Sequence, residues 1–228
     1  MIKFIKVLRQ AFFKSIDRNF FSQFGEDRII NEIFNKNIKN GFYVDVGCYH
    51  PIKHSNTFRL KKKGWSGINI DVEKDKIQVF NLTRRNDYNF LAPVSIKKEI
   101  VKIYKTQSYG VGTTIKKDFI KNENKIIDSN LLQTQTLNHI IEQSPFNNRE
   151  IDLLSIDTEG SDFDVLKSLN IEKYNPKIII IESHLNKIEG VFESEIYKYL
   201  INKKYRLRSW AFYSLIFILP NSKEIRNR

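Results

Sequence analysis

The chain has 228 residues, of which 41% are hydrophobic and 13% are aromatic. This length is enough for one domain with a buried core and short for two, so we expect a single domain over residues 1–228. No apolar run approaches the roughly 18 residues that a membrane-spanning helix requires, which argues against an integral membrane protein.

The formal net charge of +12 favours polyanionic partners such as RNA, nucleotide sugars or a phospholipid surface. The lysines are spread along the chain, and short clusters such as residues 61–63 are typical of solvated helix faces, so nucleic acid is not the partner we expect. The single cysteine, Cys48, excludes an intramolecular disulfide. It fits the reducing cytoplasm, which is the compartment that we expect.

Residues 1–40 form a predicted N-terminal helical segment. Apolar residues and cations alternate over residues 1–13, a pattern that indicates an amphipathic helix. Packing of this helix against the domain is favoured, and peripheral contact with an anionic membrane is the alternative. A second helix is predicted around Ile29, Ile30 and Ile33, whose spacing fits one helix face.

The next segments alternate between strand and helix patterns. Apolar runs predict strands at 42–46, 68–71 and 89–96, and helices are predicted at 55–63 and 74–85. Such alternation favours an α/β fold with a mostly parallel, doubly wound sheet.

Residues 97–135 break this rhythm with polar segments that contain glycine, and we expect an inserted hairpin or loop over the site. The alternation then resumes, and the last two strands, near 205–219, should include an antiparallel one. The remaining predicted elements are helices at 136–143, 162–169 and 192–203 and strands at 151–156 and 177–182.

Acidic residues stand at the ends of four predicted strands: Asp45, Asp71, Asp157 and Glu182. The carboxyl ends of parallel strands meet at one edge of the sheet, where ligands bind. Gly47 follows the first strand and would allow close approach of a nucleotide-like ligand. Each acid alone also fits a helix cap, which is the commoner role for Asp157, Glu159 or Asp162.

In this order the motifs resemble those of the FkbM-type methyltransferases, a family that uses S-adenosylmethionine on a Rossmann-like sheet. The resemblance covers roughly residues 22–184 and implies a class I methyltransferase fold. The matching stretches are residues 22–27, 42–51, 55–57, 64–71, 94–95 and 156–160.

The resemblance implies which residues bind the donor. Asp71 would accept hydrogen bonds from both ribose hydroxyls, and Asp45 and Gly47 would face the methionine portion, whose ammonium favours a carboxylate. Asp87 or Ser95 could meet the adenine, and Gln23 and Asp27 could fold over the donor. His50, Asn56 and Asp157 complete the donor-binding positions that it implies.

Methyl transfer to an alcohol requires an aligned acceptor oxygen and the removal of its proton. Asp157, Glu182 and His184 are the candidate catalytic residues, acting directly or through a bound metal. They could supply a carboxylate and imidazole site for a divalent metal, but no compact ligand spacing demands one, and metal dependence stays open. The predicted activity is O-methylation of a sugar hydroxyl in a glycan or glycan precursor.

Three alternatives remain at this level. An RNA methyltransferase would use the positive charge, and a non-catalytic module could keep only donor binding. A nicotinamide-dependent oxidoreductase could share the sheet. However, Cys48, Tyr49 and His50 follow Gly47 where a dinucleotide pyrophosphate needs further glycines, which favours S-adenosylmethionine.

Overall fold

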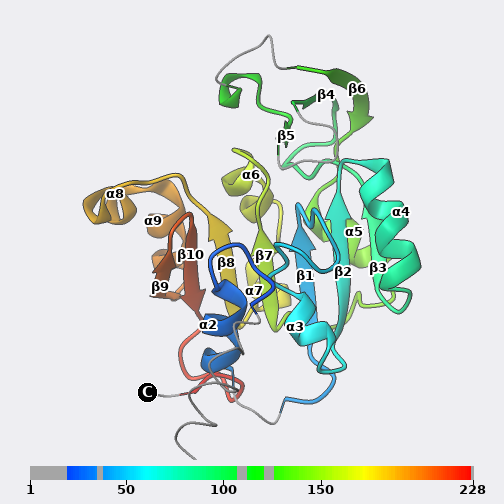
Figure 1. Ribbon diagram of the computed structural model, residues 1–228. Coiled ribbons are helices and arrows are strands. Elements are labelled where there is room, and N and C mark those ends of the chain that lie inside the picture. The colour runs from blue at the N-terminus through cyan, green and yellow to red at the C-terminus, as the bar shows by residue number, and fades with distance from the viewer. Residues whose placement is uncertain (1–19, 35–37, 107–111, 121–125, 227–228) are drawn as a thin grey trace, which may run out of the picture.

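The computed structural model describes residues 20–34, 38–106, 112–120 and 126–226. Its main layer is a seven-stranded sheet with the strand order β3-β2-β1-β7-β8-β10-β9 (Figure 1). Neighbouring strands from β3 to β8 run parallel, and β10 runs antiparallel to both β8 and β9. The predicted fold class is confirmed. The strands are β1 (Phe42–Val46), β2 (Ser66–Asp71), β3 (Tyr88–Leu91), β7 (Leu153–Ile156), β8 (Ile178–Glu182), β9 (Arg206–Ala211) and β10 (Ser214–Ile218).

Helices cover both faces of this sheet (Figure 1). On one face Ile30 and Leu60 pack with Tyr43, and on the other Leu137 and Val165 belong to the larger apolar cluster of the core. The central strands β1, β2, β7 and β8 are buried on both sides, which explains their continuous apolar runs. The helices are α2 (Glu26–Ile33), α3 (Phe58–Lys61), α4 (Lys74–Thr83), α5 (Leu137–Gln143), α6 (Asp162–Lys167), α7 (Ile171–Tyr174), α8 (Ile188–Glu193) and α9 (Glu195–Asn202).

The segment between β3 and α5 forms a second, antiparallel sheet beyond the carboxyl ends of the main strands (Figure 1). It consists of β4 (Ile100–Lys105), β5 (Thr113–Thr114) and β6 (Asp128–Gln133), with a short 3-10 helix, η2 (Lys117–Phe119). Glu73, just before α4, holds it in place. Thr113 Oγ1 donates a hydrogen bond of 2.8 Å to Glu73, and Lys105 forms an ion pair with the same carboxylate.

Several element boundaries differ from the sequence-based expectation. Helix α3 covers only residues 58–61 of the predicted range 55–63, and β3 ends at Leu91, before the end of the predicted range 89–96. The predicted helix 192–203 is two helices, because Ser194 has an extended conformation and its side chain caps α9 by accepting a hydrogen bond from Tyr197 N. Helix α7 was not expected.

The predicted N-terminal helix over residues 1–13, together with its proposed membrane contact, lies outside the described residues. Among the helices that are described, none combines the length and the apolar character needed to cross a bilayer.

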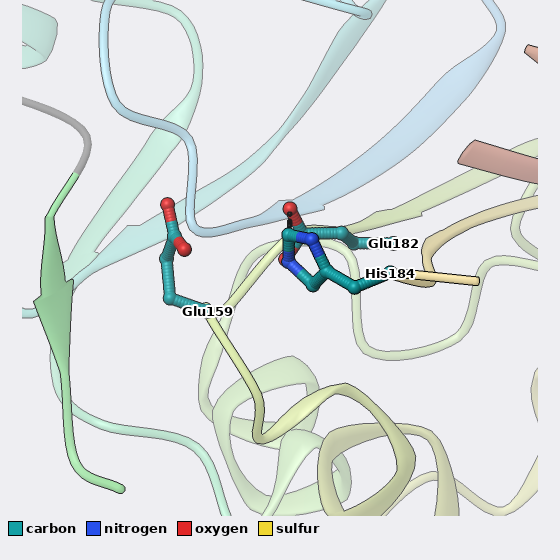
Figure 2. Close-up of side chains that lie close together, drawn as sticks. All are labelled: Glu159, Glu182 and His184. Atoms are coloured by element: carbon teal, nitrogen blue, oxygen red, sulfur yellow. Dashed lines mark ion pairs between the residues drawn. The ribbon is translucent and has the colours of Figure 1, made fainter. Parts of the chain in front are cut away.

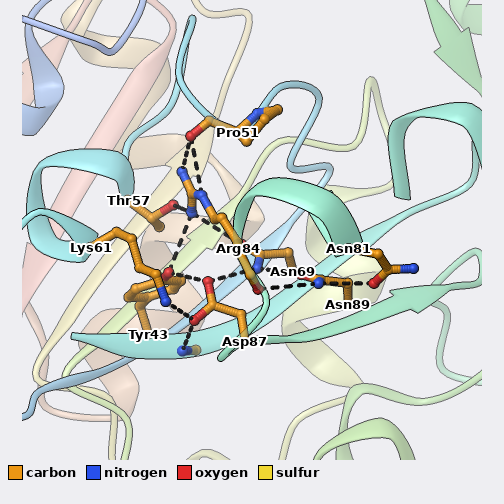
Figure 3. Close-up of polar contacts among 10 residues, drawn as sticks. Tyr43, Pro51, Thr57, Lys61, Asn69, Asn81, Arg84, Asp87 and Asn89 are labelled. Carbon is orange, nitrogen blue, oxygen red and sulfur yellow. Dashed lines mark hydrogen bonds and ion pairs between the residues drawn. The ribbon is translucent and has the colours of Figure 1, made fainter. Parts of the chain in front are cut away.

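A buried arginine, Arg84, connects the loop after β1 to the sheet (Figure 3). Arg84 directly follows α4, and the residue is only 1% exposed. Each guanidinium nitrogen reaches an oxygen acceptor, so the charge is satisfied although it is buried. The acceptors are Pro51 O at 3.1 Å, Thr57 Oγ1 at 2.8 Å, Ser55 Oγ at 2.9 Å, and Tyr43 OH and Asn69 Oδ1, each at 3.3 Å.

We expect Arg84→Met to lower the free energy of unfolding by about 3 to 5 kcal/mol, because removal of the guanidinium leaves several buried oxygens without a donor. Urea denaturation monitored by circular dichroism measures this change. Arg85→Met is the matched control, because Arg85 is exposed and, among the residues that the structure describes, its side chain bonds only Leu82 O, at 3.2 Å. Equal stability of the two variants would contradict the structural role of Arg84.

Candidate functional site

A cavity of about 250 Å³ lies at the carboxyl ends of β1, β2, β7 and β8. The inserted sheet contributes Thr113, Thr114 and Ile115 to its wall. Apolar side chains line the part near β2 and β3, and acidic side chains line the part near β7 and β8. The other lining residues are Gln23, Val46, Gly47, Tyr49, Ile70, Asp71, Val72, Lys76, Ala92, Pro93, Val94, Asp157, Thr158, Glu159, Ser161, Glu182, His184 and Tyr213.

The turn after β1 requires glycine at position 47. Gly47 has a φ of +80°, and its N–H donates a 2.9 Å hydrogen bond to Ile70 O. A Cβ at this position would lie 1.7 Å from the carbonyl oxygen of Asp157. The tips of β1 and β7 therefore touch through their backbones, and this contact forms the floor of the cavity.

Asp71 ends β2 at the wall of the cavity. Its carboxylate accepts hydrogen bonds from Tyr49 N at 3.1 Å and Glu73 N at 2.9 Å, and it lies 3.7 Å from Lys76 Nζ. Burial raises the pKa of Asp71, and the charge of Lys76 opposes this effect. Since a carboxylate has about four acceptor positions, Asp71 can still accept hydrogen bonds from a ligand.

The turn between β7 and α6 places Glu159 in the cavity. Asp162 holds this turn by accepting hydrogen bonds from Thr158 N at 2.8 Å and Gly160 N at 3.1 Å. It caps no N–H group of α6, because the N-cap residue is Ser161 and no side chain caps that helix. Glu159 has a φ of 53°, in the left-handed region that most residues avoid. The fixed turn maintains this conformation and holds the Glu159 side chain at the cavity wall.

Glu182 and His184 stand at the end of β8. Glu182 Oε1 lies 3.1 Å from His184 Nε2. The imidazole ring also contacts Phe119 and Tyr213, with ring centroids 5.1 Å and 4.9 Å apart. One carboxylate and two aromatic rings therefore fix the orientation of His184.

The carboxyl groups in the acidic part of the cavity are harder to ionise than exposed ones. Burial, and then the charges of Asp162 and Glu159, raise the pKa of Asp157, although solvent reaches its side chain through the cavity. Burial and the neighbouring acids also raise the pKa of Glu182, and burial raises that of Glu159 to about 7. This crowding of carboxylates favours a positively charged ligand.

The structure brings six of the sequence-predicted site residues to the cavity wall. Asp157, Glu182 and His184 gather at the β7 and β8 ends, as expected for residues at parallel strand tips. The donor-binding candidates among the six are Gln23, Gly47, Asp71 and, again, Asp157.

Asp45 and Asp87 lie outside the cavity, in the polar layer around Arg84. Asp45 points to the sheet face opposite Val46 because side chains alternate along a strand, and it accepts a 2.8 Å hydrogen bond from Thr57. Asp87 accepts hydrogen bonds from Tyr43 OH at 2.6 Å and Lys61 Nζ at 2.7 Å (Figure 3). Both carboxylates connect parts of the scaffold to one another.

Four other candidates also lie outside the cavity. Asp27 accepts hydrogen bonds from Ser22 Oγ at 2.7 Å and Arg59 Nε at 2.8 Å, so it fixes the segment before α2. The remaining three make hydrogen bonds within the scaffold. They are His50, whose Nδ1 accepts from Ile52 N and Lys53 N, Asn56, which donates to Ser155 Oγ, and Ser95, whose N–H donates to Gln135 O.

The sequence interpretation missed several cavity residues. Glu159 lies within a motif that was recognised, but it was interpreted as a cap. Ser161 is buried at the wall, and its hydroxyl has no hydrogen-bond partner within the described parts of the chain, which makes it available to a ligand. Lys76 and Tyr213 carry no local sequence signal, because only the packing of α4 and β10 brings them to the site.

We expect Gly47→Ala to lower both stability and affinity for S-adenosylhomocysteine, because the added methyl group forces apart the tips of β1 and β7. Gly64→Ala is the matched control: Gly64 has a φ of +87°, but a Cβ there would meet no atom within 4 Å. The control should lose only about 1 to 2 kcal/mol from backbone strain. Chemical denaturation and calorimetry measure the two effects, and equal losses in both variants would contradict the close contact.

Comparison with known proteins identifies the family. Residues 45–207 match the family model described as the methyltransferase FkbM domain. The fold is similar to a crystal structure of an FkbM methyltransferase from Methylobacillus flagellatus, with 12% identity, a TM-score of 0.50, and coverage of 84% of this chain and 50% of that one. This chain therefore spans about half the length of that relative.

A TehB-like, S-adenosylmethionine-dependent methyltransferase from Corynebacterium glutamicum also matches, with 11% identity, a TM-score of 0.44, and coverage of 96% and 97% of the two chains. No curated protein matches the sequence significantly. The family model covers well over half of the 228 residues. The chain belongs to the FkbM methyltransferase family.

Proposed function

We propose that this methyltransferase uses S-adenosylmethionine to methylate a hydroxyl oxygen, with a sugar hydroxyl of a glycan or glycan precursor as the acceptor. The observation that carries the proposal is one continuous cavity with two chemically different ends. Asp71 lies at one end, and Asp157, Glu182 and His184 lie at the other. Membership of the family implies use of the donor.

The β1 and β2 side of the cavity fits the adenosyl part of this donor. Gly47 lines this side of the cavity, and Asp71 has acceptor capacity for the ribose hydroxyls. Ile70, Val72 and Val94 provide apolar contacts for an adenine ring. The unpartnered hydroxyl of Ser161 is a further hydrogen-bonding group at the wall.

The acidic side of the cavity fits the reacting part of the donor and the acceptor. When bound, the donor supplies an activated methyl group on a positively charged sulfur. Asp157 and Glu159 place negative charge where a sulfonium and an ammonium would be stabilised. The same charge disfavours an acidic acceptor, so a neutral hydroxyl is the better substrate.

An alcohol must lose its proton as the new carbon–oxygen bond forms, and the chain offers proton acceptors at the right place. Asp157, Glu182 and His184 line the same end of the cavity, and the contact between Glu182 and His184 orients the imidazole ring. We assign proton removal to this group. The remaining acceleration comes from holding the acceptor oxygen aligned and shielded from water.

Aromatic side chains support a sugar as the acceptor. Phe119 and Tyr213 flank His184, and Phe212 continues this surface, with its ring centroid 4.7 Å from that of Tyr213. The electron-rich face of an aromatic ring attracts the weakly positive C–H groups of a sugar ring. Carboxylates beside these rings can accept hydrogen bonds from the sugar hydroxyls.

We expect Asp71→Ala to weaken binding of S-adenosylhomocysteine by roughly tenfold or more, about 1.4 kcal/mol, because hydrogen bonds to a charged group are lost. Titration calorimetry measures the affinity. Asp75→Ala is the control, since Asp75 is exposed in the first turn of the neighbouring α4. A thermal melt of each variant accounts for the backbone contacts of Asp71, and unchanged affinity in a folded variant would place the donor elsewhere.

Transfer can be tested with methyl-labelled S-adenosylmethionine and a panel of sugars, nucleotide sugars and oligosaccharides. We expect a labelled product that survives mild base, because methyl ethers resist conditions that hydrolyse methyl esters. His184→Ala should reduce turnover by about tenfold or more without changing affinity for S-adenosylhomocysteine. His139→Ala, an exposed histidine on α5, should behave as wild type. Label found only in RNA, or only in base-labile esters, would overturn the sugar assignment.

A further inference from the structure

Three side chains of the acidic end converge on one point from two neighbouring strands (Figure 2). They are Glu159 from the turn after β7, Glu182 at the end of β8, and His184 two residues later. Each offers one possible ligand atom, and these atoms all lie within 4.8 Å of one another. This spacing brings three oxygen and nitrogen ligands around a volume that could hold one ion.

The separation of Glu182 and His184 matches that of two ligands on the same cation. Glu182 Oε1 and His184 Nε2 are 3.1 Å apart. For metal–ligand bonds of about 2.1 Å, adjacent ligands in an octahedron are about 3 Å apart. All three residues also line the cavity, so further coordination positions would face its interior and remain accessible to a substrate.

A second observation points to a missing ligand. The Glu182 side chain is 10% exposed, and its buried Oε2 atom has no hydrogen-bond donor among the residues described other than the neighbouring carboxyl group of Asp157, which can donate only when it is protonated. A buried carboxylate oxygen without a donor is destabilising. A bound cation would stabilise this oxygen. It would also reduce the repulsion between the carboxylates at the ends of β7 and β8.

Charges around the cluster also favour a cation. Asp157 and Asp162 lie close enough to act electrostatically on Glu182. The charge of Lys76 acts on Glu159, but its ion pairs are with Glu73 and Asp71, and Lys116 pairs with Asp164. Local negative charge is therefore in excess.

We infer that Glu159, Glu182 and His184 form a binding site for a divalent first-row metal ion such as Mn²⁺. A mixed set of two carboxylates and one imidazole suits such ions better than it suits Mg²⁺ or Ca²⁺, which favour oxygen ligands alone. The ligand set differs from the one considered from the sequence, because Glu159 takes the place of Asp157. Only the folded β7–α6 turn shows that Glu159 is close to His184.

In the proposed function, on which this part rests, the ion would bind the acceptor hydroxyl. Coordination to a divalent cation lowers the pKa of a bound hydroxyl and fixes its orientation. The methyl acceptor would then be a hydroxyl group at the open side of the site. As the methyl group moves from the donor sulfur to this oxygen, the hydroxyl proton would pass to Asp157, which lines the same end of the cavity and is not a ligand.

The test uses Mn²⁺ alone, with a protein that carries no polyhistidine tag. Electron paramagnetic resonance measures free Mn²⁺, whose signal decreases as the ion binds. We expect saturable binding of one ion per chain, weakened about tenfold or more in Glu159→Gln, Glu182→Gln and His184→Ala. Glu193→Gln and His139→Ala are matched controls on exposed residues and should bind as wild type.

Calorimetry with S-adenosylhomocysteine on the same samples separates this inference from the proposed function. Variants that still bind S-adenosylhomocysteine are folded, so their loss of Mn²⁺ can be assigned to the ligands. If the wild type binds S-adenosylhomocysteine but binds Mn²⁺ weakly and without saturation, the metal site is wrong and the methyltransferase proposal stands. Equal Mn²⁺ binding by wild type and Glu182→Gln would also overturn the site.

Discussion

The buried guanidinium of Arg84 is the interaction on which the shape of the site depends. It connects the end of α4 to the loop after β1 through Pro51 O and Ser55, and to the sheet through Tyr43 and Asn69 (Figure 3). A buried cation of this kind is stable only when its donors are satisfied, so the loop has little freedom to move. Arg84, which does not line the cavity, therefore fixes the loop that follows Gly47.

A second constraint is the repulsion among the acids at the β7 and β8 ends. Parallel strands bring Asp157 and Glu182 side by side, and the turn that Asp162 holds adds Glu159. Burial and mutual repulsion raise the pKa values of these groups, which means that the folded protein holds unfavourable charge there. Such an arrangement is typical of a functional site, because a cationic ligand relieves the repulsion.

The sequence predicts this edge well because strand tips depend on local patterns. Apolar runs ending in Asp71, Asp157 and Glu182 identified three acids of the cavity wall, and Gly47 identified the turn between them. The sequence could not show that Gly47 lines the cavity and Asp45 does not. Which face of β1 borders the cavity depends on how the neighbouring elements pack. Nor could the sequence place Asp87, whose partners Tyr43 and Lys61 are distant in sequence. The break at Ser194 had a local signal, a capping serine, that was overlooked.

The strand order explains why one cavity can serve two substrates. Asp71 ends β2 and Glu182 ends β8, with β1 and β7 between them. With strands about 4.8 Å apart, these two acids are separated by about 14 Å along the sheet edge. A single small ligand would not contact both acids. In the proposed function, a donor bound over β1 and β2 and an acceptor bound over β7 and β8 would together contact both. The two would meet near Gly47 and Asp157, which both line the cavity.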